Sequence, residues 1–309
     1  MIPDGRTPVV VVTGFLGSGK TTLLNRLLAQ EGDALVIVNE FGEVPVDHHL
    51  LETPEEKTLA LPNGCLCCRL RGDLEETLVG AAMRRRRGEI AGFDRVIVET
   101  SGLADPGPVA QTLFADQALA RDFKLGPIVA VVDAFDPEGR NLSKTVAQAQ
   151  IAAADIVVLS KTDRTADLSP AKAEVLAINP GVQCIPARYG DVDPAILRLE
   201  GSEKAFSAPA HAGEFQTFVL QFAAPVPKAL LERFLALLVD LRGRDLLRVK
   251  GIVALDDGAK VLVQGVRHVF DRLREVSAPS TGLVFITQDL RHDDVRTLWN
   301  AMTNLRGKT

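Results

Sequence analysis

The fold class follows from GFLGSGKTT (Gly14–Thr22), a stretch that contains the phosphate-binding pattern G-x-x-x-x-G-K-S/T. The stretch comes directly after an apolar run at Val9–Val12 and opens an amphipathic segment at Thr21–Gln30. In this order of strand, loop and helix, backbone N–H groups and the helix N-terminus can bind phosphate. We therefore predict a nucleoside triphosphate site, although the loop alone does not select the base.

The residue types within this loop predict separate roles. Lys20 is expected to reach the β- and γ-phosphates, and the hydroxyl of Thr21 is expected to bind Mg²⁺, so both are predicted catalytic residues. The glycines let the backbone wrap closely around the phosphates. The other predicted nucleotide ligands of the loop are Gly14, Gly17, Ser18, Gly19 and Thr22.

Short apolar runs alternate with helical patterns over the first two-thirds of the chain. The runs are nearly all apolar, which is typical of strands that are buried on both faces of a sheet. The alternation predicts an α/β fold, namely a P-loop NTPase with a mostly parallel sheet covered by helices. The expected strands are Val9–Val12, Leu35–Val38, Val96–Val98, Ile128–Val132 and Ile156–Leu159.

The length of 309 residues leaves room for a second domain. Residues 202–213 are small, polar and proline-bearing. We expect them to link a P-loop domain at 1–201 to a smaller α+β domain at 214–309. Hydrophobic patterns in the second domain give the order β-α-β-β-β-α. Its expected elements are Phe215–Phe222, Pro227–Leu241, Leu247–Leu255, Lys260–Val263, Leu283–Thr287 and Asp293–Met302.

Base recognition is predicted at Ser160-Lys161-Thr162-Asp163, directly after the run Ile156–Leu159. The carboxylate of Asp163 could accept hydrogen bonds from N1–H and N2–H₂ of guanine, because a carboxylate is a two-oxygen acceptor. Adenine offers no such pair of donors. The stem of Lys161 would pack along the base plane. The motif is similar to the N-K-x-D of GTPases, with Ser160 in place of Asn, and it favours GTP over ATP.

A second carboxylate, Glu99, ends the run Val96–Val98 and begins the stretch Glu99-Thr100-Ser101-Gly102. Ligands of open α/β sheets bind at this carboxyl edge of the strands. Glu99 is therefore expected to hold Mg²⁺, directly or through a water, as a catalytic residue. Gly102 would let the backbone approach the γ-phosphate. The structural alternative is a surface carboxylate before a turn.

Three of the four cysteines, Cys65, Cys67 and Cys68, fall within NGCLCC. Thiolates are soft ligands that favour Zn²⁺ or Cu(I), and Co²⁺ is also compatible. Three ligands from one loop leave a tetrahedral ion one ligand short, which suits a transferable ion better than a structural one. Buried structural thiols and a redox pair are the alternatives. Cys184 is expected in the core, and the candidates for a fourth ligand are Glu43, His48 and His49.

Charge and hydropathy exclude several classes of protein. The net charge of -5 argues against a nucleic-acid binder, because such proteins neutralise phosphates with clustered Lys and Arg. The apolar run near the N-terminus, Val9–Val12, is shorter than a secretory signal or a spanning helix requires. We therefore expect no membrane association and a cytoplasmic location, where thiols stay reduced.

The chain resembles the CobW-type metallochaperone GTPases, relatives of HypB and UreG in the SIMIBI class of P-loop proteins. The C-X-C-C element beside a GTPase loop is specific to that family, and RVKG (Arg248–Gly251) is similar to part of its second domain. The resemblance covers essentially the whole chain. The stretches that carry it, in the expected order, are GFLGSGKTT (Gly14–Thr22), NEFGEVPVD (Asn39–Asp47), NGCLCC (Asn63–Cys68), ETSGLADP (Glu99–Pro106) and SKTD (Ser160–Asp163).

The resemblance implies a GTPase that binds a transition metal, Zn²⁺ or else Co²⁺, at C-X-C-C. It would hand the metal to a client metalloprotein that docks through the C-terminal domain. By the same likeness Asn39–Asp47 would be the switch region, with Glu43 as a metal-binding or water-positioning catalytic residue and Asp47 as a Mg²⁺ contact. Two features depart from the family: Pro45-Val46 stands where Gly-Ile is common, and the linker holds only His211. Self-association, a P-loop kinase and a non-catalytic metal or redox sensor stay open as alternatives.

Overall fold

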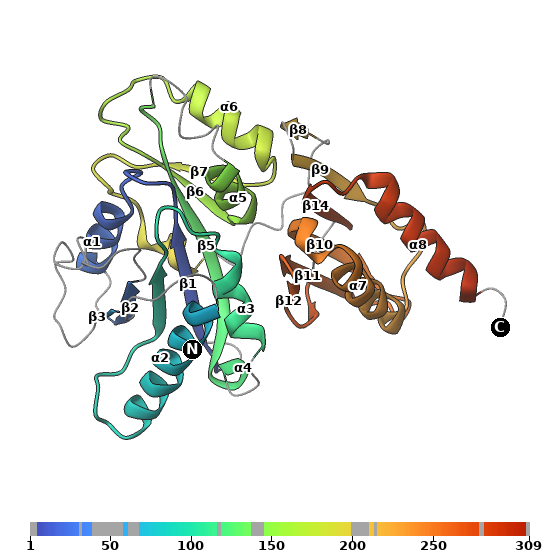
Figure 1. Ribbon diagram of the computed structural model, residues 1–309, viewed down its shortest axis with the longest axis horizontal. Coiled ribbons are helices and arrows are strands. Elements are labelled where there is room, and N and C mark those ends of the chain that lie inside the picture. Colours follow the sequence, from blue (N-terminus) through green and yellow to red (C-terminus); the bar gives the residue numbers. More distant parts are fainter. Residues whose placement is uncertain are drawn as a thin grey trace. The chain divides into compact units, whose positions relative to one another are not determined.

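The computed structural model describes residues 5–30, 33–38, 58–60, 68–115, 119–136, 145–198, 210–212, 215–277 and 281–306. Contacts divide the chain into two compact units. One contains Met1–Glu174 and Val182–Ser202, and the other contains Val175–Gly181 and Glu203–Thr309. Each unit is built around one sheet (Figure 1).

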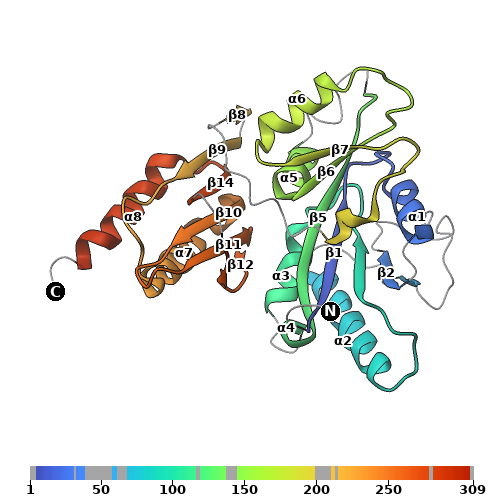
Figure 2. The same ribbon diagram turned by 180° about the vertical axis from the view of Figure 1, so that it is seen from behind.

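The sheet of the first unit has seven described strands in the order β3-β2-β4-β1-β5-β6-β7, and every pairing is parallel. Figure 2 shows the central pair β1 and β5 side by side from behind. The predicted α/β fold with a parallel sheet is confirmed. The strands are β1 (Thr7–Thr13), β2 (Ala34–Val38), β3 (Thr58–Ala60), β4 (Arg95–Glu99), β5 (Phe123–Asp133), β6 (Ile156–Ser160) and β7 (Gln183–Pro186).

Helices enclose this sheet because its strands are apolar on both faces. Every residue of β2, β4 and β6 is buried. Leu23, Leu24 and Leu27 of the first helix pack into the same core. Figure 1 shows the helices arranged around the sheet. They are α1 (Lys20–Gln30), α2 (Cys68–Arg86), α3 (Gly107–Ala115), α4 (Leu119–Asp122), α5 (Thr145–Ala153) and α6 (Ser169–Ile178), with a 3-10 turn at Pro194–Arg198.

The second unit contains an antiparallel sheet in the order β12-β11-β10-β14-β9-β8, with β13 paired to β11. Phe218 and Phe285 stack across neighbouring strands at 5.2 Å, and Phe234 meets Trp299 edge-on at 5.2 Å between the two helices. The predicted C-terminal α+β architecture is confirmed. The elements are β8 (Ala210–Ala212), β9 (Phe215–Leu220), α7 (Lys228–Arg242), β10 (Leu246–Ala254), β11 (Lys260–Val266), β12 (Val269–Phe270), β13 (Arg274–Glu275), β14 (Gly282–Gln288) and α8 (His292–Arg306).

Short edge strands are the main difference from the sequence patterns. Strand β8 lies inside the stretch 202–213 that composition marks as a linker, and its backbone pairs with β9. Strands β3 and β7 contain only three and four residues. The domain division at 202–213 stays a prediction. Within the described residues, no helix has the length and apolar character that crossing a membrane requires.

Candidate active site

The candidate site lies where the carboxyl ends of the parallel strands of the first unit meet. Ligands of open α/β sheets bind at this edge, because polar loops follow the strand ends there. Each of five strands delivers a distinct element to it. The elements are the glycine loop after β1, Glu99 at the end of β4, Asp133 at the end of β5, the Ser160–Asp163 stretch at the end of β6, and Ala187 after β7.

The glycine loop has a backbone that only glycine adopts freely. Gly14, Gly17 and Gly19 have φ angles of 147°, 70° and 97°. A Cβ on Gly14 would lie 2.3 Å from the carbonyl oxygen of Val131, so strand β5 leaves no room for a side chain there. The predicted loop therefore forms, directly between β1 and α1. The structure brings together the predicted ligands Gly14, Gly17, Ser18, Gly19, Lys20 and Thr21, with Thr22 exposed in the first turn of α1.

The amine of Lys20 lies over this loop. Its Nζ donates hydrogen bonds to the carbonyl oxygens of Gly14 at 2.9 Å and Phe15 at 3.4 Å. Phosphate oxygens carry negative charge and are stronger acceptors than these carbonyls. A bound triphosphate would therefore compete with these carbonyls for the lysine amine.

Thr21 and Glu99 meet at the place expected for Mg²⁺. The Thr21 hydroxyl donates to Oε1 of Glu99 at 3.3 Å, and Glu99 is only 4% exposed. Strands β1 and β4 set this distance, since Val12 and Glu99 are register partners. A hydroxyl and a carboxylate oxygen are hard ligands of the kind that Mg²⁺ prefers. The donor set fits the ion, and the surface-carboxylate alternative for Glu99 is wrong.

Gly102 lies against the glycine loop. A Cβ at this position would lie 2.7 to 2.9 Å from the side chain and backbone of Leu16, which only a glycine avoids. Hydrogen bonds to β1 fix the start of the loop that contains Gly102. Thr100 donates its N–H to the Val12 carbonyl and its hydroxyl to Thr13 Oγ1, both at 2.9 Å. The backbone of Gly102 is thus held beside the loop that would bind the phosphates.

The residues that are predicted to recognise the base lie at the end of β6 and directly after it. The Lys161 amine pairs with Oδ2 of Asp133 at 2.5 Å. The backbone of Lys161 has a left-handed φ of 54°. Asp163 lies half-buried two residues further on. The Ser160 hydroxyl donates to the Ser18 carbonyl at 2.6 Å, with the Val132 carbonyl as a longer second acceptor at 3.1 Å. The recognition stretch is therefore tied to the phosphate loop.

Two parts of the site were missed by the sequence patterns. Asp133 fixes the Lys161 amine, and its Oδ1 accepts the Phe135 N–H at 2.9 Å. The sequence does mark Asp133 as a carboxylate at the end of an apolar run, which is the same pattern that marks Glu99. The loop after β7 was also missed: Thr162 donates its N–H to the Ala187 carbonyl at 3.3 Å. Periodicity gives little signal for so short an edge strand.

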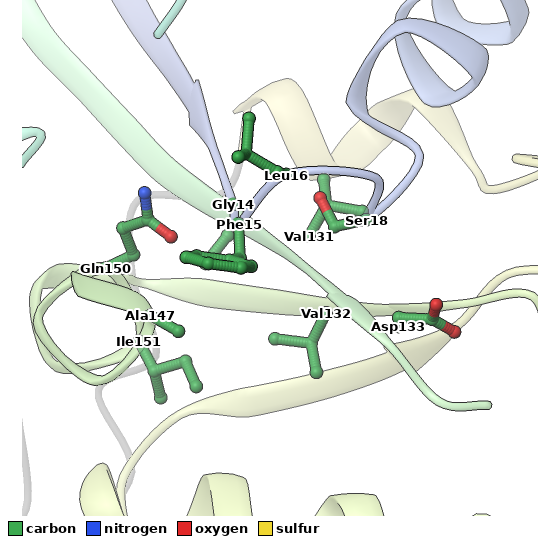
Figure 3. A pocket seen from close by; sticks show the side chains of 11 residues that line it. Gly14, Phe15, Leu16, Ser18, Val131, Val132, Asp133, Ala147, Gln150 and Ile151 are labelled. Atoms are coloured by element: carbon green, nitrogen blue, oxygen red, sulfur yellow. The ribbon is translucent and has the colours of Figure 1, made fainter. Parts of the chain in front are cut away.

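A cavity lies behind the glycine loop, between that loop, β5 and α5 (Figure 3). Its lining is largely apolar. Gln150 and Ser18 add two buried polar atoms, Oε1 and Oγ, that have no hydrogen-bond partner among the described residues. The other lining residues are Gly14, Phe15, Leu16, Ala130, Val131, Val132, Asp133, Ala147 and Ile151.

Most of the predicted transition-metal site lies outside the described residues. Glu43, Cys65 and Cys67 belong to that part of the chain, and Cys68 is described only as the first residue of α2. Elsewhere in the described ranges, no group of three or more His, Cys, Asp or Glu side chains could hold a metal ion. Cys184 is half-buried on the edge strand β7 instead of lying in the core, and burial raises the pKa of its thiol.

The glycine loop, the Thr21–Glu99 pair and the parallel sheet define a P-loop nucleotide-binding protein. Residues 8–186 match the family described as CobW/HypB/UreG, nucleotide-binding domain, and residues 215–303 match the cobalamin synthesis protein cobW C-terminal domain. The chain belongs to the CobW/HypB/UreG family, and it is a GTPase of that family.

Individual relatives match nearly the whole chain. The zinc chaperone YjiA of Escherichia coli is 31% identical over 306 residues, which cover 93% of this chain and 96% of that protein. The zinc-regulated GTPase metalloprotein activator 1 of Schizosaccharomyces pombe is 30% identical, covering 85% and 76%. The crystal structure of Zn(II)-bound YjiA GTPase from E. coli superposes with a TM-score of 0.73 at 27% identity, covering 96% and 99%.

Proposed function

We propose that this GTPase carries Zn²⁺, or Co²⁺ as the alternative cargo, on Cys65, Cys67 and Cys68 and delivers it to a client metalloprotein. The observation that carries the proposal is where the cysteine stretch enters the fold. Strand β3 ends at Ala60 and α2 begins at Cys68, so the connection between them starts at the carboxyl edge that also carries the glycine loop. The metal ligands and the nucleotide would therefore belong to the same edge of the sheet.

The names of the relatives support zinc as the cargo. YjiA is named a zinc chaperone, and the yeast relative is named a zinc-regulated GTPase metalloprotein activator. Thiolates bind Zn²⁺ tightly but exchange it with other soft ligands. The proposal also requires a reducing compartment such as the cytoplasm, where the thiols stay free.

Binding of GTP would use the residues of the described site. Asp163 would accept the two guanine donors, with the Lys161 stem along the base, while Lys20 and the loop N–H groups would hold the phosphates. Thr21 and Glu99 would hold Mg²⁺, which neutralises charge on the β- and γ-phosphates. Gly102 would meet the terminal phosphate through its backbone, and Glu43 would position the attacking water.

Nucleotide and metal would be coupled through Asn39–Asp47, which follows β2 at the same edge of the sheet. GTP would order this segment and draw the three thiolates together, and hydrolysis would release the metal to the client. Thermodynamic linkage makes this reciprocal, because a nucleotide that tightens metal binding must be bound more tightly by the metal-loaded protein. The C-terminal unit would dock the client.

Metal affinity in two nucleotide states tests this proposal. A competition titration with a chromophoric chelator should give Zn²⁺ affinity about tenfold higher with a non-hydrolysable GTP analogue than with GDP. Changing Cys65 and Cys67 to Ser removes two direct ligands. Zn²⁺ affinity should therefore fall by more than the roughly 10–100-fold that follows loss of an outer-shell partner. Cys184→Ser is the matched control, because its half-buried thiol lies on β7. Equal affinity in both nucleotide states would contradict the switch.

A further inference from the structure

Helix α5 contacts the loop after β4 through one side chain. Gln150 is only 1% exposed, and its Nε2 donates to the carbonyl oxygens of Gly102 at 3.3 Å and Ala104 at 3.0 Å. Both protons of the amide are therefore used on a single loop. Its Oε1 faces the opposite way and lines the cavity behind the glycine loop, on the side of Phe15 (Figure 3).

The segment that Gln150 holds is the middle of that loop. Its start is fixed to β1 through Thr100, and its end is fixed where Asp105 Oδ1 accepts the Gly107 N–H at 2.8 Å, at the start of α3. Between these anchors the carbonyls of Gly102 and Ala104 point to α5 and meet the Gln150 amide. The amide thus sets how far this middle part can move from its position.

The position of Gly102 has a direct consequence for the glycine loop. Because Gly102 has no Cβ, its backbone approaches Leu16 more closely than any other residue could. Gly102 therefore has little room to move toward Leu16. The hydrogen bond from the Gln150 amide to the Gly102 carbonyl holds the same backbone from α5.

We propose that Gln150 is a positioning residue for the terminal phosphate: it holds the Gly102 backbone where only a triphosphate reaches it. The inference rests on the proposed nucleotide site and deepens it, because it identifies what makes that site distinguish GTP from GDP. In this proposal Gln150 acts on the nucleotide only through the Gly102 backbone. Its loss should therefore weaken the contact to the γ-phosphate and leave the contacts to the base and the β-phosphate intact.

The test compares triphosphate with diphosphate binding in matched variants. Gln150→Met keeps the length and apolar stem of the side chain but removes both donated hydrogen bonds. GTPγS affinity should fall about tenfold, the effect of losing one modest hydrogen bond to the terminal phosphate, while GDP affinity stays unchanged. Gln148→Met is the control, because Gln148 lies two residues earlier on α5, is only partly buried and donates no side-chain hydrogen bond to the described loop after β4.

A second variant keeps the test decisive if Gln150→Met fails to fold. Gln150→Leu also lacks both donors but buries neither a charge nor a new polar group, so it should reduce GTPγS affinity by a similar factor while GDP affinity stays unchanged. Equal weakening of GTPγS and GDP would make Gln150 a packing residue and overturn the proposal, as would wild-type affinity for both. A wild-type protein that prefers ATP would instead contradict the proposed function, so the two failures are distinguishable.

Discussion

The side-chain hydroxyl of Ser160 donates a hydrogen bond to the backbone carbonyl of Ser18, with 2.6 Å between the two oxygens. Ser160 is the last residue of β6 and Ser18 lies in the glycine loop, so 142 residues separate them in the chain. The bond joins the stretch that is predicted to recognise the base to the loop that is predicted to bind phosphate. A guanine nucleotide would span the two.

The first prediction concerns this bond. Ser160→Ala removes the hydroxyl that donates to the buried Ser18 carbonyl. The loss of this bond should lower the free energy of unfolding by about 1–3 kcal/mol. We expect GTP and GDP affinity to fall together, because both nucleotides use the same loop, while the preference for guanine stays. Isothermal titration calorimetry with GDP, GTP and ATP analogues measures the two guanine-nucleotide affinities and the preference for guanine. Loss of base preference without loss of affinity would contradict this role for Ser160.

The second prediction concerns base selection by Asp163. Asp163→Asn replaces one acceptor oxygen with a donor, which clashes with the guanine N–H groups. Affinity for GDP should fall on the order of 100-fold relative to wild type, because a buried polar mismatch discriminates strongly. Competition between GDP, xanthosine diphosphate and ADP gives the readout. Unchanged GDP preference in the variant would contradict this role for Asp163, whereas ATP preference in the wild-type protein would favour the kinase alternative.

The third prediction separates a GTPase from a non-catalytic sensor. Lys20→Ala removes the amine that lies 2.9 Å from the Gly14 carbonyl. Hydrolysis should fall by at least about 100-fold, the usual consequence of losing a charge-stabilising donor at a transition state. Phosphate release is the assay, and thermal unfolding of the same sample verifies the fold. Equal rates in the variant and wild type would support the sensor alternative.

A fourth prediction uses the single tyrosine of the chain, Tyr189. It is 59% exposed with a left-handed φ of 52°, in the loop whose Ala187 carbonyl accepts the Thr162 N–H. On its other side, Gly190 approaches the Thr22 carbonyl of α1 so closely that a Cβ would lie 2.9 Å away. This loop therefore touches both nucleotide-binding segments, and GDP should change the tyrosine emission.

Trp299 is the single tryptophan, so Trp299→Phe leaves Tyr189 as the only strong emitter. Trp299 packs edge-on against Phe222 and Phe234, a site that accepts another aromatic ring. The titration is then repeated with Lys20→Ala added, which should shift the curve to higher GDP concentration. Emission that does not respond to saturating GDP would refute the prediction.

The fifth prediction concerns acid stability. A hydrogen bond from the buried Arg95 guanidinium lowers the pKa of Asp94 from its ordinary value, and the charge of Arg95 adds to this. A folded-state pKa below the unfolded value means that the ion pair stabilises the protein above the unfolded value of 3.8 and loses its effect as pH falls through the folded-state pKa. Asp94→Asn should therefore lower the urea midpoint at pH 7 and converge with wild type under strongly acidic conditions. An equal deficit at every pH would point to a purely structural role.

Sequence patterns were most informative where one local rule governs one short segment. The glycine loop, the strand ends at Glu99 and Ser160, and the α+β character of the C-terminal unit were all predicted, because apolar runs and glycine spacing have direct local causes. Contacts that depend on how distant segments pack together were not predicted. Nothing in the residues around Gln150 indicates that its amide reaches Gly102, since the pairing depends on how α5 packs against the loop after β4.

Edge elements were also beyond the reach of the patterns. Strand β3 has three residues and β7 has four, too few for a periodic signal, and β8 has a composition that resembles a linker. Their pairing partners, β2, β6 and β9, supply the register that their own sequences do not. The predicted metal stretch rests on residue type alone, and its position in the chain puts it between β3 and α2.

The antiparallel sheet of the C-terminal unit ends at both borders in very short strands, three residues of β8 on one side and two residues each of β12 and β13 on the other. Such borders offer few unpaired N–H and C=O groups to another chain. A fragment beginning after Ala212 would lose β8 and expose the six residues of β9, Phe215–Leu220, along one border. Preparations of the isolated C-terminal unit should therefore begin before Ala210, so that the sheet keeps its protection against intermolecular strand pairing.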